Sequence, residues 1–99
     1  MKAIMDPLEA FIDETIQISL SKGYPPTTFQ RMRRQYGTVS AIERLVTKGE
    51  IQSGFKKLLS LGLKDWSIEA AVLKFPERFS IDARECAEFR LRAAEQGLI

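Results

Sequence analysis

The stretch Asp6–Pro26, DPLEAFIDETIQISLSKGYPP, decides the fold class because it holds a whole helix together with its start and stop signals. Asp6 followed by Pro7 is typical of a helix N-terminus, where the carboxylate accepts a hydrogen bond from an unpaired amide and proline fits the first turn. Gly23 suits the left-handed conformation that ends many helices. These signals predict a helix over residues 7–22.

The predicted helix has one apolar face, which we expect to enter the core. Its apolar side chains repeat at intervals of three and four residues: Leu8, Phe11, Ile12, Ile16 and Leu20. Glu9 stands where a capping box would direct its carboxylate back to the helix start. Pro25 and Pro26 then enforce an elbow, because proline lacks an amide hydrogen and restricts the residue before it.

Glycine and proline divide residues 24–97 into further short helices. The predicted starts are Thr27 or Thr28, Thr38 or Ser40, Ser53, Asp65, and Ser80 or Asp82. The predicted ends are Gly37, Gly49, Gly62, Pro76 and Gly97. The second helix is expected to bury Phe29, Met32 and Tyr36, and the last to bury Cys86, Phe89 and Ala93. No stretch alternates with the period of a strand, so we predict an all-α fold, a compact single-domain bundle of about five to six short helices over residues 1–99.

Composition excludes several classes of protein. The chain has 99 residues, 44% of them hydrophobic and 28% charged, which is enough for one well-packed domain. Cys86 is the only cysteine, so an intramolecular disulfide is excluded and a reducing compartment is favoured. The chain has no histidine, the commonest general base and metal ligand. We therefore expect a non-enzymatic protein with no catalytic residues, no metal site and no cofactor.

No apolar run approaches the roughly 18 residues of a membrane-spanning helix, and the N-terminus lacks the apolar centre of a signal peptide. We therefore expect a cytoplasmic protein. The helix predicted over residues 7–22 is acidic on its polar side, so anionic lipid would repel it, and we expect no membrane partner.

The formal net charge of +2 conceals three segments of different sign. Residues 1–21 carry one lysine against four acidic residues, a net charge of −3. Residues 22–64 carry nine basic residues against two glutamates, which is +7, and residues 65–99 carry five against seven, which is −2. A basic centre between acidic ends points to an anionic partner, and the opposite signs would also support head-to-tail self-association.

Arg31, Arg33 and Arg34 form the densest basic cluster. The helical period places Arg31 and Arg34 on one face and Arg33 toward the other side. Because arginine binds phosphate through paired hydrogen bonds, these residues are candidates for binding nucleic acid or another anion, together with three lysines: Lys48, Lys56 and Lys57. The lysines extend the cluster only if the second to fourth helices pack side by side. The simpler interpretation is a solvated helix face.

Tyr24, Trp66 and Phe79 flank the predicted helices and do not follow their apolar spacing. Aromatic side chains of this kind are candidates for exposed anchors that contact a partner protein. The alternative, that each fills a gap between helices of a small core, is the simpler interpretation.

Several short motifs carry a family resemblance over residues 24–97. They are Tyr24-x-Pro26-Thr27-x-Phe29, Ser53-Gly54-Phe55-x-x-Leu58, Leu61-Gly62, and Ser67-Ile68-Glu69-Ala70-x-Val72-Leu73. With them the chain resembles a family of small bacterial all-helical domains of unknown function, which occur alone or as C-terminal accessory modules. Residues 1–22 lie outside the resemblance, and the family offers no catalytic residues to carry over.

These observations lead to two hypotheses. The first is a non-enzymatic accessory module that binds another protein, since the chain has a self-sufficient core and no evident catalytic group. The alternative is a nucleic-acid-binding domain that uses the basic central segment, with an affinity that falls steeply with salt.

Overall fold

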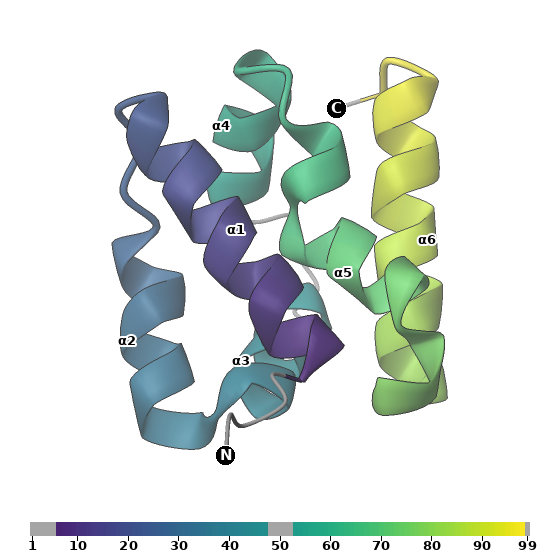
Figure 1. Cartoon of the computed structure of the whole chain (residues 1–99). Helices are drawn as coiled ribbons and strands as arrows, with labels where there is room; N and C mark the ends of the chain where they lie inside the picture. The colour runs from purple at the N-terminus through teal and green to yellow at the C-terminus, as the bar shows by residue number, and fades with distance from the viewer. Residues whose placement is uncertain (1–5, 48–52, 99) are drawn as a thin grey trace.

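The computed structural model describes residues 6–47 and 53–98, and this part of the chain is helical without a strand (Figure 1). Its elements are α1 (Pro7–Ser21), α2 (Thr27–Tyr36), α3 (Thr38–Val46), α4 (Ser53–Ser60), η1 (Lys64–Trp66), α5 (Ile68–Lys74), η2 (Pro76–Arg78) and α6 (Ile81–Glu95), where η marks a single 3₁₀ turn. The radius of gyration of 13.0 Å is that of a compact chain of about 100 residues. The predicted all-α bundle is confirmed.

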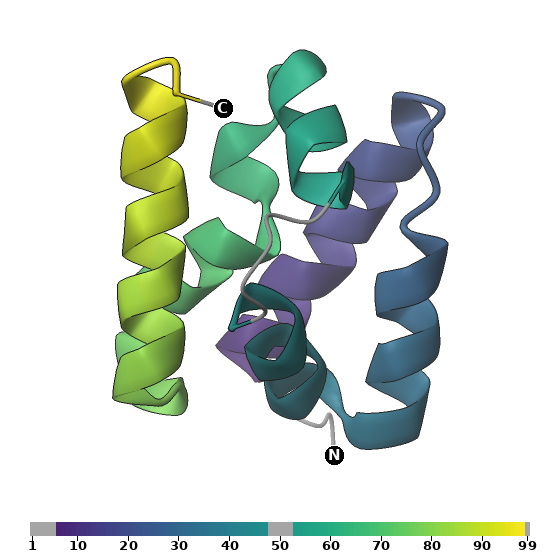
Figure 2. The same cartoon turned by 180° about the vertical axis from the view of Figure 1, so that it is seen from behind.

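Helices α2 and α6 stand at opposite edges of the molecule, and the other α-helices, α1, α3, α4 and α5, lie between them. In Figure 1, α1 crosses the front between α2 and α5, and α6 stands at the edge opposite α2. In the view from behind, α3 and α4 lie in front of α1 (Figure 2). Helix α3 packs on α2, α5 and α6, and α5 packs on both α1 and α6, so α6 contacts the bundle along one side only.

The core lies where α1, α3, α5 and α6 meet. Its fully buried large apolar side chains are Leu8, Ile12, Ile42, Val46 and Val72. Helix α6 contributes mainly small side chains, Ala83 and Ala87, both with no exposed surface. Because these residues are small, the backbone of α6 can approach α5 closely. The helix therefore packs on α5 through short side chains.

The signals that bound α1 are confirmed, but the predicted capping box is wrong. The Asp6 carboxylate accepts a hydrogen bond from the Leu8 amide at 2.9 Å, and Gly23 adopts a φ of 77°. Glu9 does not turn back to the cap, because its carboxylate is held by α2 and α3 as described below. Leu20, expected in the core, is 42% exposed.

The predicted starts at Thr27, Thr38 and Ser53 are confirmed, but several caps differ from the prediction. Helix α2 is preceded by Pro26 and α3 by Gly37, and neither helix has a side-chain cap. The cap of α5 is Ser67, whose hydroxyl accepts from the Ala70 amide at 3.0 Å; Asp65 instead lies inside the turn η1. Of the two predicted starts of the last helix, Ser80 is the cap of α6. Gly49, the predicted end of the third helix, lies outside the described residues.

Two aromatic residues expected in the core lie at the surface. Phe89 on α6 is 67% exposed, because the buried side of that helix runs through Ala83, Ala87 and Leu91 instead. Tyr36, at the end of α2, is 41% exposed, and the Arg44 guanidinium lies 4.0 Å from the centre of its ring. Intervals of three and four residues occur on more than one side of a helix, so spacing alone does not identify the buried side.

Candidate functional site

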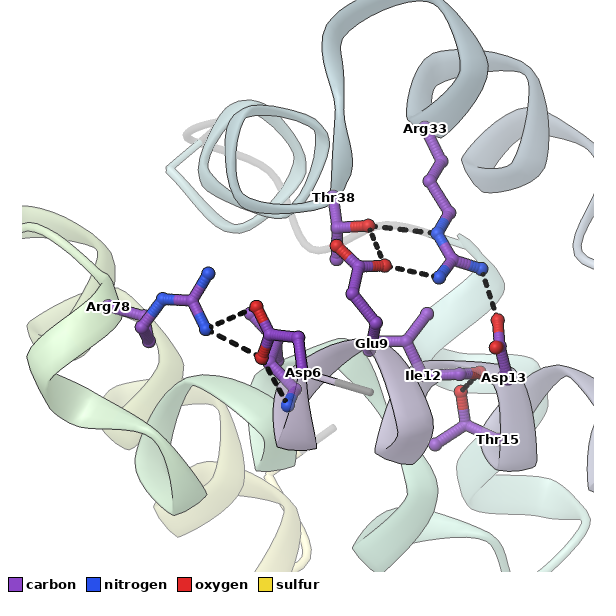
Figure 3. A network of polar contacts seen from close by, with 9 residues as sticks. Asp6, Glu9, Ile12, Asp13, Thr15, Arg33, Thr38 and Arg78 are labelled. Atoms are coloured by element: carbon purple, nitrogen blue, oxygen red, sulfur yellow. Dashed lines mark hydrogen bonds and ion pairs between the residues drawn. The ribbon is translucent and has the colours of Figure 1, made fainter. Parts of the chain in front are cut away.

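Arg33, from the predicted basic cluster, joins α2 to α1 and α3 (Figure 3). Its guanidinium donates to Asp13 Oδ1 at 2.8 Å and to Glu9 Oε1 at 2.5 Å. Its Nε donates to the Thr38 hydroxyl at 2.9 Å, and that hydroxyl donates in turn to Glu9 at 2.7 Å. Burial alone would lower the pKa of Arg33, but the hydrogen bonds to the two carboxylates outweigh it and raise the pKa above its usual value. Arg33 is therefore a permanent cation that ties three helices together.

The other two arginines of the cluster face outward. Arg31 and Arg34 are exposed, on the side of α2 away from Arg33, as the helical period predicts. The arginines of the cluster therefore fall into two groups. Arg33 has its donors engaged within the fold, whereas Arg31 and Arg34 present theirs to solvent.

The lysines do not adjoin these arginines along packed helices. Lys56 and Lys57 are both exposed on α4. Helix α4 packs mainly against η1, while α2 packs mainly against α3, so the described residues do not show the side-by-side packing of the second to fourth helices that would extend the cluster. Lys48 lies outside the described residues.

Ion pairs within the molecule compensate part of the charge that is segregated along the sequence. Besides the pairs of Arg33, Arg78 donates to both oxygens of Asp6 at 2.8 and 2.9 Å. The hydrogen bond from Arg78 lowers the pKa of Asp6, with a smaller contribution from the Leu8 amide. Three of the acidic side chains of α1 and its cap thus have basic partners in the same chain, which weakens the basis for head-to-tail self-association.

The three candidate aromatic anchors fall into two groups. Phe79 is 6% exposed and belongs to the core, so the prediction that it is a surface anchor is wrong. Trp66 is half-buried and stacks on Phe11, with ring centres 5.4 Å apart and planes inclined by 15°. Tyr24 is half-buried after α1, where its carbonyl accepts a hydrogen bond from the Ser19 hydroxyl. Tyr24 and Trp66 have a further property in common: both line a cavity.

This cavity has a volume of about 210 Å³ and lies between the C-terminal half of α1, the start of α2, α4 and the start of α5. Its walls are mainly apolar: Ile16, Phe29, Leu45, Phe55, Leu58 and Ile68. The Pro25–Thr28 elbow forms another part of its lining, and Pro25, Thr27 and Thr28 are exposed, so the cavity meets the surface at the elbow.

Glu69, another lining residue, belongs to a buried ion pair that the sequence did not predict. Glu69 is 1% exposed and Arg90 is 3% exposed. Arg90 donates to Glu69 Oε2 at 3.0 Å and to the Leu45 carbonyl at 3.2 Å. The second carboxylate oxygen, Oε1, has no hydrogen-bond partner among the described residues. Burial raises the pKa of Glu69, and the hydrogen bond from Arg90 offsets part of that rise.

A sequence signal for Glu69 did exist. It stands three residues before Val72, on the side of α5 that enters the core. An acidic residue in the first turn of a helix is usually explained by the helix dipole, which favours a negative charge there. With that explanation at hand, the sequence gives no reason to expect Glu69 in a buried ion pair.

The described residues contain no cluster of side chains suited to hold a metal ion. None of the helices in the described ranges is long and apolar enough to cross a membrane. No protein family, curated protein or solved structure matches the chain. The family resemblance carried by the motifs of residues 24–97 stays a prediction.

Proposed function

We propose that this chain is a non-enzymatic interaction module whose main partner is another protein. The observation that carries the proposal is the outer side of α6, where Phe89 is 67% and Ile81 is 64% exposed. The two residues are eight apart, so they lie about two turns from each other along one side of the helix, with the exposed Glu85 between them.

Large exposed side chains on this helix have no structural explanation in the monomer. The opposite side of α6 holds the helix on α5 and α3 through mainly small and aliphatic residues and Arg90, and Phe89 lies outside that buried side. A large aromatic side chain surrounded by polar residues is a common anchor of a protein interface, because its burial on binding removes much apolar surface from water.

The residues around this apolar pair indicate the chemistry of the partner. Asp82, Glu85 and Glu88 are exposed on α6, and only Glu88 has a basic partner among the described side chains, Arg92 at the next turn. The matching surface is therefore an apolar groove with a basic rim, which would receive Phe89 and compensate the acidic side chains.

Site-specific photo-crosslinking tests this proposal. We would replace Phe89 with p-benzoylphenylalanine, express the chain in its natural host, and place the same group at Gln17 as a control, since Gln17 is exposed on α1. We expect a discrete protein adduct from position 89 and none from position 17. Adding Ile81→Glu should remove that adduct while leaving the fold intact. An adduct that forms equally at both positions, or at neither, would contradict the proposal.

The alternative, nucleic-acid binding, rests on the exposure of Arg31, Arg34, Lys56 and Lys57. Its test is a gel-shift titration with DNA and RNA at two salt concentrations, comparing the parent with the Arg31→Glu/Arg34→Glu variant, which leaves the Arg33 network intact. Tight, salt-sensitive binding that the variant loses would establish this alternative. We expect weak binding that the substitutions hardly change.

A further inference from the structure

The cavity between α1, α2, α4 and α5 has the size of a small organic molecule. Its volume is about 210 Å³. A dry apolar cavity of about 150 Å³ in another protein holds benzene, so one aromatic ring with a short alkyl chain fits this space. Unfilled space among apolar side chains costs stability in proportion to its volume, so an occupant that fills the cavity would stabilise the fold.

Five elements supply the apolar wall of the cavity. Ile16 comes from α1, Phe29 from α2, Leu45 from α3, Phe55 from α4 and Ile68 from α5. The first four side chains are buried and Ile68 is half-buried, so the wall belongs to the interior of the molecule. An apolar molecule that lies against this wall leaves water, which favours its binding.

The buried polar side chains of the lining offer a ligand little to bind. The Thr15 hydroxyl donates to the Ile12 carbonyl at 2.8 Å, and the Ser19 hydroxyl donates to the Tyr24 carbonyl. Glu69 is 1% exposed, so its carboxylate presents almost no surface to the cavity. A polar group on a ligand would therefore lose its hydrogen bonds to water without gaining a donor from these side chains.

A charged ligand is disfavoured for a related reason. Among the described residues that line the cavity, Glu69 alone has a carboxylate and none is a lysine or an arginine. Because Glu69 is itself buried, an ionic group placed inside the cavity would have no accessible counter-charge in the lining. The lining thus favours a ligand that is both uncharged and apolar.

We infer that this cavity is a binding site for a small uncharged hydrocarbon of the size of one aromatic ring with a short alkyl chain. The elbow that contains Pro25, Thr27 and Thr28 is the entrance, since these three residues line the cavity and are exposed. The described lining residues all precede α6 in the chain, so this site does not depend on the protein-binding proposal.

Four probes with the same phenyl-alkyl body test the selection: propylbenzene, 2-phenylethanol, 2-phenylethylamine and 3-phenylpropionate. Binding to the parent chain is followed by the fluorescence of Trp66, the only tryptophan, which lines the cavity. We expect saturable binding of propylbenzene, at least fivefold tighter than that of 2-phenylethanol and at least tenfold tighter than that of either charged probe. Absence of saturable binding, or a polar probe that binds as tightly as propylbenzene, would overturn the inference.

Two variants locate the site through ligand-induced stability. Leu58→Trp places a larger side chain in the cavity wall, and the matched control Leu73→Trp adds the same group at an exposed position of α5 outside the lining. A ligand that binds only the folded chain stabilises it, so propylbenzene should raise the urea midpoint of the parent and of Leu73→Trp, as followed by circular dichroism. The increase should be absent from Leu58→Trp. An equal increase in both variants would place the binding elsewhere.

A smaller substitution keeps the test decisive if Leu58→Trp does not fold. Leu58→Phe adds less volume to the wall, and Leu73→Phe is its control. We expect Leu58→Phe to weaken propylbenzene binding at least threefold in calorimetry and Leu73→Phe to leave it unchanged. Equal affinities of these two variants would contradict the assignment of the site to the cavity.

Discussion

At the scale of the residue, the position of each arginine along α2 decides whether it pairs within the fold or faces solvent. The helical period correctly separated Arg33 from Arg31 and Arg34, because one turn of spacing is a local property of the chain. The partners of Arg33 could not be predicted in the same way. Glu9 and Asp13 precede it by more than five helical turns of sequence, and only the packing of α2 beside α1 brings them within reach.

Arg33→Met should destabilise the fold, whereas Arg34→Met should not. The first variant removes hydrogen bonds to Glu9, Asp13 and Thr38. Because the two carboxylates are partly exposed, solvent screening limits the expected loss to about 1 kcal/mol. The exposed Arg34 should give a change within about 0.5 kcal/mol. Urea unfolding measures both values, and equal losses would show that the network adds no stability.

Arg78→Gln should reduce stability at neutral pH but not in acid. Arg78 lowers the pKa of Asp6 in the folded state, so the pair contributes stability above the unfolded value near 3.8 and loses it as the pH falls through the lower folded value. The urea midpoints of the parent and the variant should therefore differ slightly at pH 7 and converge as the pH falls through the folded pKa of Asp6. A difference that persists in acid would assign the effect of Arg78 to packing.

At the scale of the element, the residues that end helices were more predictable than the residues that cap their starts. Gly23, Gly37, Gly62 and Gly97 all have positive φ angles, which glycine adopts without strain, so each gave an unambiguous stop. Starts were ambiguous because serine, threonine and aspartate are interchangeable as caps. At α5 the chain inserts the turn η1, and this places Ser67 at the cap in place of Asp65.

Ser67→Ala should cost about 1 kcal/mol of stability, with a range of about 0.5 to 2 kcal/mol. The Ser67 hydroxyl is fully buried, accepts from the Ala70 amide at 3.0 Å and donates to the Lys64 carbonyl at 2.8 Å. Asp65→Ala is the matched control, because Asp65 is exposed and should change stability by no more than about 0.5 kcal/mol. A larger loss from Asp65→Ala than from Ser67→Ala in thermal or urea unfolding would restore the original assignment of the cap.

At the scale of the whole molecule, the fold class followed from local signals but the functional surfaces did not. The apolar spacing and the glycine stops are properties of neighbouring residues, and they suffice to predict a helical bundle. The cavity and the Glu69–Arg90 pair arise where α1, α3, α4, α5 and α6 converge, so no segment of the sequence displays them. The exposed side of α6 was missed because Phe89 satisfied the spacing of a buried residue.

The separation between core and outer surface gives a last prediction, in which Phe89→Ala and Ile42→Ala have opposite effects. Ile42 has no exposed surface, so its truncation leaves a cavity and should cost about 2 to 5 kcal/mol. Phe89 is 67% exposed, and its truncation should change the free energy of unfolding by no more than about 0.5 kcal/mol. If Phe89 anchors a partner, the stable variant should nevertheless lose that partner, while any Ile42→Ala chain that remains folded should keep it. A large loss of stability in Phe89→Ala would show instead that the ring supports the fold, and α6 would no longer be a candidate interface.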